Sequence, residues 1–312
     1  MLSRRNVRVK VMQILYSMGR DVTQDYTKGL LGYRRQINQS FDLYLLVLFY
    51  LIKISSYASI DSKNRKSRLR PSPEDQFFKP ILAVNPFIKS LTENIGLFNL
   101  IDNHDIREKL DEDLVRSMYN EFLKTEDYKQ FLQAEYLSPD DYINIYLNLL
   151  KSCLNSSHFQ DIIEDNYSQW IDDESLVVGA IKKTLKQLPV ASDFYKDYIP
   201  SEEATVEFGE FLLETVFFKD RELLEIISPN LQNWDAERVA VIDMILIKMA
   251  IAELMNFTSI PGKVTLNEYV EISKTYSTDK SKDFINGILD KLFKQLMENQ
   301  KITKEGRGLL DN

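Results

Sequence analysis

The first twenty residues bring together side chains that can bind a polyanion. They include five cations and no acidic residue, the cations being Arg4, Arg5, Arg8, Lys10 and Arg20. On a helix, Gln13 and Tyr16 share one arc with Arg5 and Arg20, and Arg8 lies on the flank of that arc. Guanidinium groups hold phosphates bidentately, and a neighbouring aromatic or amide group can stack on or hydrogen-bond an unpaired base. The segment therefore predicts a site for single-stranded nucleic acid, with a solvated helix end as the alternative.

A helix has to position these groups, and the sequence supplies its pattern. Apolar residues recur at the spacing of one helical face, at Val7, Val11, Ile14, Leu15 and Met18. About 20 residues cannot hide such a stripe by themselves, so the stripe must pack on another part of the chain. We expect that partner among helices beyond residue 200.

A second basic patch lies between residues 63 and 70. It holds five cations without an acid, namely Lys63, Arg65, Lys66, Arg68 and Arg70. The formal charge of the whole chain is nevertheless -8, so the remaining sequence is strongly acidic and should confine any polyanion to one place. Ser, Pro and like charges over residues 62–73 predict an exposed loop. This loop either extends an RNA track or is simply solvated.

Other chemistries find little support in the sequence. The single cysteine, Cys153, is expected as a buried thiol, and with His104 and His158 it fits no zinc-ligand spacing. Gly262-Lys263 lacks the earlier glycine and the following Ser/Thr of a phosphate loop. We therefore expect no catalytic residue, no metal site and no cofactor.

Composition points to a helical protein. Ten Gly and nine Pro among 312 residues supply too few turns for an all-β chain, and 44% hydrophobic residues are too many for a disordered one. The longest apolar stretch, Leu43 to Ile52, has about ten residues, whereas a membrane helix needs about 20. The N-terminus lacks the pattern of a signal peptide. We expect an all-α, cytoplasmic protein with Phe41 to Ile54 as a buried helix rather than a membrane anchor.

Several further helices are predicted along the chain. In the first 200 residues the patterns cover 105–131, 139–154, where Ser138-Pro139 marks the start, and 175–186. Pro189 and Pro200 then indicate a boundary near residue 200. Beyond it, Thr265 and Glu268 have the spacing of a capping box, and a last helix over 281–297 contains Gly287, expected to allow close helix approach.

Four stretches together resemble the NusB transcription antitermination family. They run from Arg4 to Tyr16, from Ala250 to Leu254, from Ile260 to Tyr276 and from Phe284 to Lys291. The resemblance implies a discontinuous NusB-like core made of residues 1–20 and 201–298. Residues 21–200 would then be a large helical insertion, and residues 299–312 a C-terminal tail.

The resemblance also implies a function. Family members are all-α pairs of small helical bundles that bind boxA-type single-stranded RNA together with NusE, a ribosomal protein. They support ribosomal RNA transcription and reach the transcribing RNA polymerase through other Nus factors, without enzymatic activity. The implied RNA-binding residues are Arg4, Arg5, Arg8, Lys10, Gln13, Tyr16 and Phe284, of which Phe284 could equally be a core residue.

Two other functions stay open at this point. The chain could be a protein-interaction scaffold whose arginines serve only acidic partners. It could also be the NusB-like part of an RNA-modifying methyltransferase, but that enzyme needs a Gly-rich cofactor loop and catalytic cysteines downstream. The sequence has one cysteine and ends fifteen residues after Met297, so the enzyme is the less expected of the two.

Overall fold

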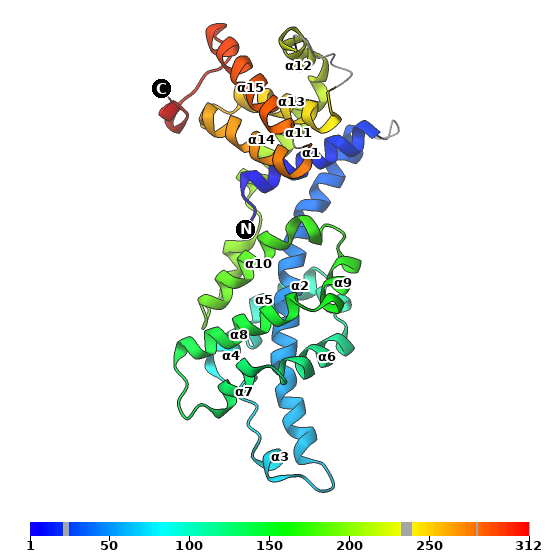
Figure 1. Cartoon of the computed structure of the whole chain (residues 1–312), viewed down its shortest axis with the longest axis vertical. Helices are drawn as coiled ribbons and strands as arrows, with labels where there is room; N and C mark the ends of the chain where they lie inside the picture. Colours follow the sequence, from blue (N-terminus) through cyan, green and yellow to red (C-terminus); the bar gives the residue numbers. More distant parts are fainter. Residues whose placement is uncertain (21–24, 232–238, 279, 312) are drawn as a thin grey trace. The chain divides into compact units, whose positions relative to one another are not determined.

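The computed structural model describes residues 1–20, 25–231, 239–278 and 280–311 (Figure 1). All regular elements within these ranges are helices, and no strand occurs among them, which confirms the all-α prediction. The chain divides into two compact units. Unit 1 contains Met1 and residues 38–199, and unit 2 contains residues 2–37 and 200–312. The structural division near the N-terminus thus lies between Ile37 and Asn38, within one helix, and the second lies between Ile199 and Pro200.

Unit 1 is built on the second part of α2 (Tyr26–Lys66), whose residues from Phe41 to Ile54 form much of its buried core. The helix α8 (Pro139–Leu154) packs against four neighbours, α6, α7, α9 and α10. The remaining elements of this unit are α3 (Pro73–Phe77), α4 (Pro86–Thr92), α5 (Ile95–Asn103), η1 (Ile106–Lys109), α6 (Glu112–Phe122), α7 (Glu126–Gln133), α9 (Ser157–Asn166), α10 (Trp170–Lys186) and η2 (Phe194–Tyr198). The predicted start of α8 is confirmed, because Ser138 caps it in a reciprocal box with Asp141.

Two predictions for unit 1 were wrong. The helical pattern over 105–131 is not one helix, because Asp111 accepts from the Leu114 amide and Thr125 from the Tyr128 amide, and each starts a new helix, α6 and α7. The basic stretch expected as a loop from residue 62 is helical as far as Lys66. An Asp61–Arg65 ion pair at i,i+4 and three cations at the negative end of the helix dipole stabilise that last turn.

The helix α2 is long and apolar enough, by length and composition, to cross a membrane, and it is the one such helix among the described residues. In the structure, however, 72% of its apolar window is buried inside the protein. The apolar side chains from Phe41 to Ile54 are thus already covered by unit 1, which confirms the prediction of a core helix.

Unit 2 places α1 (Arg4–Arg20) against helices from the far end of the sequence (Figure 1). The apolar stripe of α1 is buried and packs on η3, α11 and α13, as the sequence predicts. The elements of unit 2 beyond residue 200 are η3 (Glu203–Glu210), α11 (Phe211–Phe218), α12 (Asp220–Ile227), η4 (Ser228–Asn230), α13 (Val241–Asn256), α14 (Gly262–Tyr276), α15 (Ser281–Glu298) and η6 (Gly306–Asp311). The largest contacts of α15 are with α14 and α13.

Two local predictions for unit 2 were also wrong. Thr265 and Glu268 form no capping box, because α14 already begins at Gly262, which puts Thr265 inside the helix, where it is completely buried. Gly287 allows no close approach, since a Cβ built there would meet no atom within 4 Å. Both segments are helical, as the sequence predicts. The contacts that Thr265 and Gly287 make in the structure nevertheless differ from those predicted.

A π-helix, η3, carries one glycine that the packing requires. A Cβ on Gly209 would lie 1.9 Å from the hydroxyl oxygen of Tyr33 and 2.6 Å from Cγ1 of Val7. Tyr33 and Val7 are themselves fully buried, and the Tyr33 hydroxyl donates a hydrogen bond of 2.8 Å to the Thr205 carbonyl. Gly209 is therefore what lets α1, the first part of α2 and η3 meet.

We expect Gly209→Ala to lower the free energy of unfolding by about 1 to 3 kcal/mol, the usual penalty of overpacking. The matched control is Gly287→Ala, which adds the same methyl group to an open helical position and should stabilise the protein by up to about 1 kcal/mol. Urea denaturation of both variants measures the two changes. Equal stability of the two variants would contradict the packing role of Gly209.

Candidate nucleic-acid interface

A side-chain cap fixes the N-terminus of α1, so that cationic residues lie at the positive end of the helix dipole. Ser3 and Asn6 cap it reciprocally, with the Asn6 amide donating to Ser3 Oγ at 3.4 Å and the Ser3 amide to Asn6 Oδ1 at 3.1 Å. No acidic residue occupies the first turn, which instead holds Arg4 and Arg5. Free amides and the helix dipole attract anions at this end, and the two guanidinium groups add to that attraction. The local geometry therefore favours an anion beside the first turn.

Carboxylates of unit 2 form ion pairs with these exposed cations. Arg4 pairs with Glu203 at 2.9 Å, and Arg5 forms a two-point pair with Glu268 at 2.7 and 2.8 Å. The hydrogen bond from Arg5 holds the pKa of the Glu268 carboxyl below its ordinary value, although partial burial acts in the opposite direction. Because Arg4 and Glu203 both reach solvent, this pair is weak and can exchange its carboxylate for another anion.

Arg8 behaves differently from its neighbours. We expected it on the flank of an exposed arc, but its residue is only 2% exposed. Its Nε donates to Glu253 Oε2 at 2.7 Å, and its Nη2 donates to Glu253 Oε1. Burial alone would lower the pKa of Arg8, but the hydrogen bond and the charge of Glu253 outweigh it and raise that pKa. Arg8 is therefore a positioning residue beneath the surface and not a direct phosphate ligand.

Three helices meet around this buried ion pair. Glu253 of α13 also accepts hydrogen bonds from Thr265 Oγ1 at 2.8 Å and from the Tyr269 hydroxyl at 2.9 Å, both on α14. The Arg8 guanidinium lies 5.1 Å from the ring centroid of Phe208 and 5.7 Å from that of Tyr269. Every carboxylate oxygen of Glu253 thus has two donors, which fixes α1 on α13 and α14 and holds the first turn in place.

The other residues predicted on α1 divide between surface and interior. Lys10 is 2% exposed, so it does not belong to the expected basic surface. Gln13 and Tyr16 are half-buried. Arg20 donates a hydrogen bond of 2.8 Å to the Tyr16 hydroxyl, and its guanidinium lies 5.1 Å from the Tyr16 ring centroid. The surface of α1 therefore presents Arg4 and Arg5 at one end and the Tyr16–Arg20 pair at the other.

Phe284 is half-buried near the start of α15. The turn before it is anchored by Asp243, which accepts a hydrogen bond of 2.7 Å from Ser281 and another from Ser277. Asp243 is nearly buried at the beginning of α13. Phe284 itself is neither fully buried nor fully exposed, which is compatible with either of its predicted roles.

The sequence did not reveal Glu203 and Glu253 as partners of these arginines, and it predicted Glu268 only as part of a capping box. One signal was present for Glu253, because it stands within a nearly continuous apolar run from Ile247 to Leu254. A glutamate in such a run is buried and must have a partner. Nothing in the sequence alone identified that partner as Arg8, which precedes it by 245 residues.

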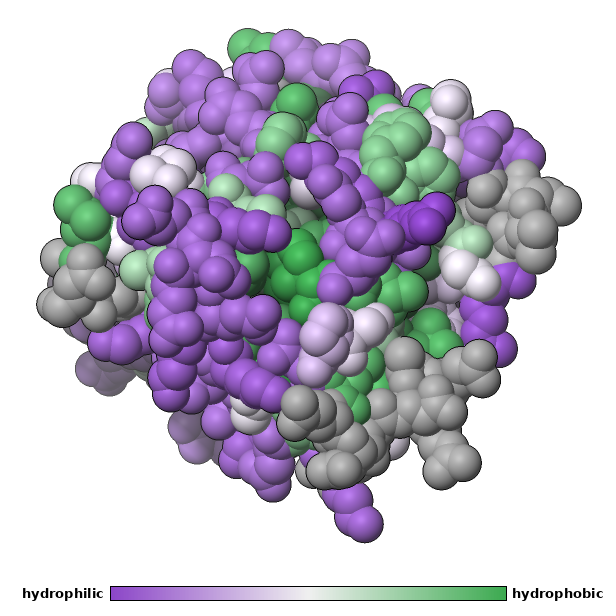
Figure 2. Space-filling model, turned by 90° about the horizontal axis from the view of Figure 1, so that it is seen from above, coloured by the Kyte–Doolittle hydropathy of each residue, from purple (hydrophilic) through white to green (hydrophobic). Residues whose placement is uncertain are grey.

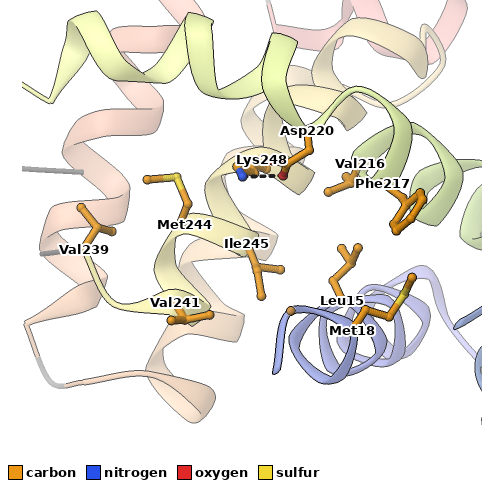
Figure 3. A pocket seen from close by; sticks show the side chains of 11 residues that line it. Leu15, Met18, Val216, Phe217, Asp220, Val239, Val241, Met244, Ile245 and Lys248 are labelled. Atoms are coloured by element: carbon orange, nitrogen blue, oxygen red, sulfur yellow. Dashed lines mark hydrogen bonds and ion pairs between the residues drawn. The ribbon is translucent and has the colours of Figure 1, made fainter. Parts of the chain in front are cut away.

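Unit 2 also contains an apolar hollow, visible as a hydrophobic area surrounded by hydrophilic side chains on one face of the molecule (Figure 2). Its volume is about 540 Å³, and the elements α1, α11 and α13 contribute most of its lining (Figure 3). Leu15, Met18, Val216 and Met244 point into it, and its charged members, Asp220 and Lys248, pair with each other. Since these charges neutralise one another, the hollow is unsuited to phosphate.

Another reactive group that the sequence singled out is the thiol of Cys153. Cys153 is fully buried in unit 1, and burial raises the pKa of its thiol to about 12. Among the residues that the structure describes, no group of three or more His, Cys, Asp or Glu side chains could hold a metal ion.

Comparison with known proteins shows which part of the chain is similar to a known family. Residues 168–294 match the model of the NusB family. The transcription antitermination protein NusB of Salinibacter ruber is 38% identical over 114 residues, which cover 36% of this chain and 71% of that protein. The chain belongs to the NusB family. The match begins within unit 1, upstream of residue 200, and leaves the first helix outside.

Two further NusB relatives give the same result. The transcription antitermination protein NusB of Chloroherpeton thalassium is 45% identical over 85 residues, 27% of this chain and 40% of that protein. The one from Listeria monocytogenes is 39% identical over 88 residues, 28% of this chain and 69% of that protein. No solved structure matches the fold. The similarity of the NusB chains therefore concerns a part of this chain, and most of unit 1 lies outside it.

The different burial of Arg8 and Arg4 gives a test by mutation. We expect Arg8→Ala to lower the free energy of unfolding by about 3 to 5 kcal/mol, because Glu253 would be left charged and buried without its cation. Arg4→Ala removes the same charge from an exposed pair and should change it by about 1 kcal/mol or less. Chemical denaturation measures both, and a similar loss in the two variants would refute the positioning role of Arg8.

Proposed function

We propose that this NusB-family chain is a non-enzymatic transcription antitermination factor of the cytoplasm. It binds boxA-type single-stranded RNA together with the ribosomal protein NusE and supports ribosomal RNA transcription. It reaches the transcribing RNA polymerase through other Nus factors. The names of the relatives support the role in antitermination. The proposed binding of RNA and NusE rests on the resemblance of the sequence motifs to those of the family.

The observation that carries the RNA proposal is the first turn of α1. Arg4 and Arg5 stand at the positive end of a capped 17-residue helix, with Arg8 locked beneath them on Glu253. Both arginines hold a carboxylate of the same chain, Glu203 or Glu268, and this supports a geometry in which their guanidinium groups can bind an oxyanion. A phosphate is a larger oxyanion with the same bidentate fit to guanidinium. Arg4 and Arg5 would contact phosphates, while Tyr16, with Gln13 beside it, and Phe284 would contact bases.

We also propose that the NusB-like core is discontinuous and combines residues 1–20 with residues 201–298. Its support is the packing of α1 on η3, α11 and α13, within a unit that joins residues 2–37 to residues 200–312. Residues 21–200 would be a helical insertion or extension, and residues 299–312 a C-terminal tail. No cofactor is assigned to any part.

Arg5→Ala tests the phosphate contacts. The slope of log affinity against log salt should fall in magnitude by about 0.7, and different RNA sequences should weaken alike. The control is Arg221→Ala, which removes an exposed, carboxylate-paired cation from α12 and should leave the slope unchanged. Anisotropy titrations of a boxA-type RNA at several salt concentrations provide the measurement. An unchanged slope in folded Arg5→Ala would remove Arg5 from the site.

Tyr16→Ala tests the base contact. Loss of a stacking ring should weaken binding by about 1 to 3 kcal/mol while the salt slope stays nearly constant. Tyr16→Phe keeps the ring and loses only the hydroxyl that Arg20 binds, so it should retain most of the affinity. If Tyr16→Ala lowers the melting temperature without changing RNA affinity, the ring has a packing role instead.

Binding of NusE and RNA should be coupled, because two exposed arginines on an acidic protein are a modest anchor for RNA. We expect saturating NusE to raise RNA affinity by about 5- to 150-fold, which corresponds to roughly 1 to 3 kcal/mol. Titrations with and without NusE measure this factor. Indifference to RNA in both conditions would favour the protein-interaction scaffold, in which the arginines serve only the carboxylates seen here.

A further inference from the structure

Unit 1 contains a second cationic surface, which we name the basic turn and define as residues 63–79. It consists of the last turn of α2, the following connection and α3, which lies beside the end of α2 (Figure 1). Two carboxylates hold it together. Asp75 accepts both 2.9 Å hydrogen bonds of Arg68 Nη1, and Asp61 accepts from Arg65 Nε at 2.8 Å. Asp75 is itself 5% exposed, so this clamp is a built part of the fold.

Further contacts fix the same segment. Ser72 and Asp75 form a reciprocal capping box at the start of α3. The Arg65 guanidinium lies 4.4 Å from the ring centroid of Phe78, and the Tyr119 hydroxyl donates to Asp61 at 3.1 Å. The basic turn is therefore preorganised, and its outward side chains keep defined positions.

The basic turn also has cationic and apolar side chains that are exposed to solvent. Lys63, Lys66 and Arg70 are exposed, and no ion pair of theirs occurs among the described residues. Leu69 is completely exposed and Phe77 is 79% exposed. The basic turn thus presents to solvent two large apolar side chains and three cations that have no ion pair in the described part of the chain, a combination suited to a ligand that is both anionic and aromatic.

We propose that the basic turn binds the backbone of single-stranded RNA independently of sequence, with Phe77 stacking on a base. Cations that follow a phosphate chain, combined with an exposed aromatic ring, are the common elements of such surfaces. Leu69 fits as well, because unstacked bases pack against aliphatic as well as aromatic side chains. The inference rests on the proposed function, since it assumes that RNA is a ligand of this chain, but it assigns RNA to a surface outside the region similar to NusB.

The charge of the chain favours a strand over an anionic membrane. The protein carries a formal charge of -8 although the basic turn is strongly positive. A planar anionic surface would also repel the acidic parts of the protein near the contact, whereas a single strand touches the basic turn alone. Leu69 and Phe77 also offer fewer carbon atoms than one myristoyl chain, which by itself binds membranes only marginally.

The test uses the full-length chain, a uridine-only RNA strand and three variants. The basic-turn variant combines Lys63→Gln, Lys66→Gln and Arg70→Gln, and it leaves the clamp residues Arg65 and Arg68 intact. Its matched control, Lys89→Gln with Lys182→Gln and Lys186→Gln, removes three exposed cations elsewhere in unit 1. We expect the basic-turn variant to lower the magnitude of the salt slope by about 2, from roughly 0.7 per phosphate contact, and the control to leave it unchanged. Phe77→Ala should weaken binding about 5- to 150-fold with little change of slope.

Several results would overturn the inference. If the basic-turn variant and the control bind the strand equally, the basic turn is not an RNA surface. If the basic-turn variant instead loses binding to mixed phosphatidylcholine and phosphatidylserine vesicles while its RNA affinity is unchanged, the surface binds lipid.

Arg5→Ala in the same series separates this inference from the proposed function. Weakening by Arg5→Ala alone overturns the role of the basic turn and leaves the α1 site standing. Weakening by the basic-turn variant alone supports the basic turn and removes the α1 site. Loss of RNA cross-links to the peptide 71–79 on Phe77→Ala would support the stacking contact independently.

Discussion

The buried ion pair between Arg8 and Glu253 is the interaction on which unit 2 depends. It joins α1 to α13, and through Thr265 and Tyr269 it also joins α14. A charge in this position is tolerable only because both oxygens of Glu253 are saturated with donors and the guanidinium lies near two rings. Apolar packing alone would let α1 rotate or slide on its stripe. The ion pair fixes one rotation, and with it the direction in which Arg4 and Arg5 point.

The carboxylates already paired with Arg4 and Arg5 compete with any anion that approaches the surface of α1. Each exposed arginine already has a carboxylate, so an incoming phosphate has to replace Glu203 or share Arg5 with Glu268. This exchange costs part of the binding energy and reduces affinity for stray polyanions. Under the proposed function, a second ligand that releases these arginines from Glu203 and Glu268 would raise RNA affinity, and the expected coupling to NusE rests on this exchange. The negative charge of the rest of the chain also lowers the affinity for stray polyanions.

Unit 1 follows a different principle. Its long core helix, α2, brings a nearly continuous apolar segment from Phe41 to Ile54, and the helices α4 to α10 with η1 and η2 contribute most of the other buried side chains of this core. The buried aromatic rings of this core, among them Tyr44, Tyr50 and Tyr119, find hydrogen-bond partners for their hydroxyls. The basic turn lies at the end of this core helix, where Lys63, Lys66 and Arg70 are exposed to solvent.

The sequence by itself determined the helical class, the apolar stripe of α1, the start of α8 and the family. These features depend on the order of neighbouring residues, through helical periodicity, side-chain capping of free amides and motif spacing. It could not tell Arg8 from Arg4 and Arg5, because periodicity gives the direction of a side chain but not what lies opposite it. Only the tertiary structure decided that Glu253 buries Arg8 and that Arg4 and Arg5 keep solvent on one side. It also decided that Thr265 binds Glu253 rather than capping α14, because α14 begins at Gly262 and places Thr265 inside the helix, beside the buried carboxylate.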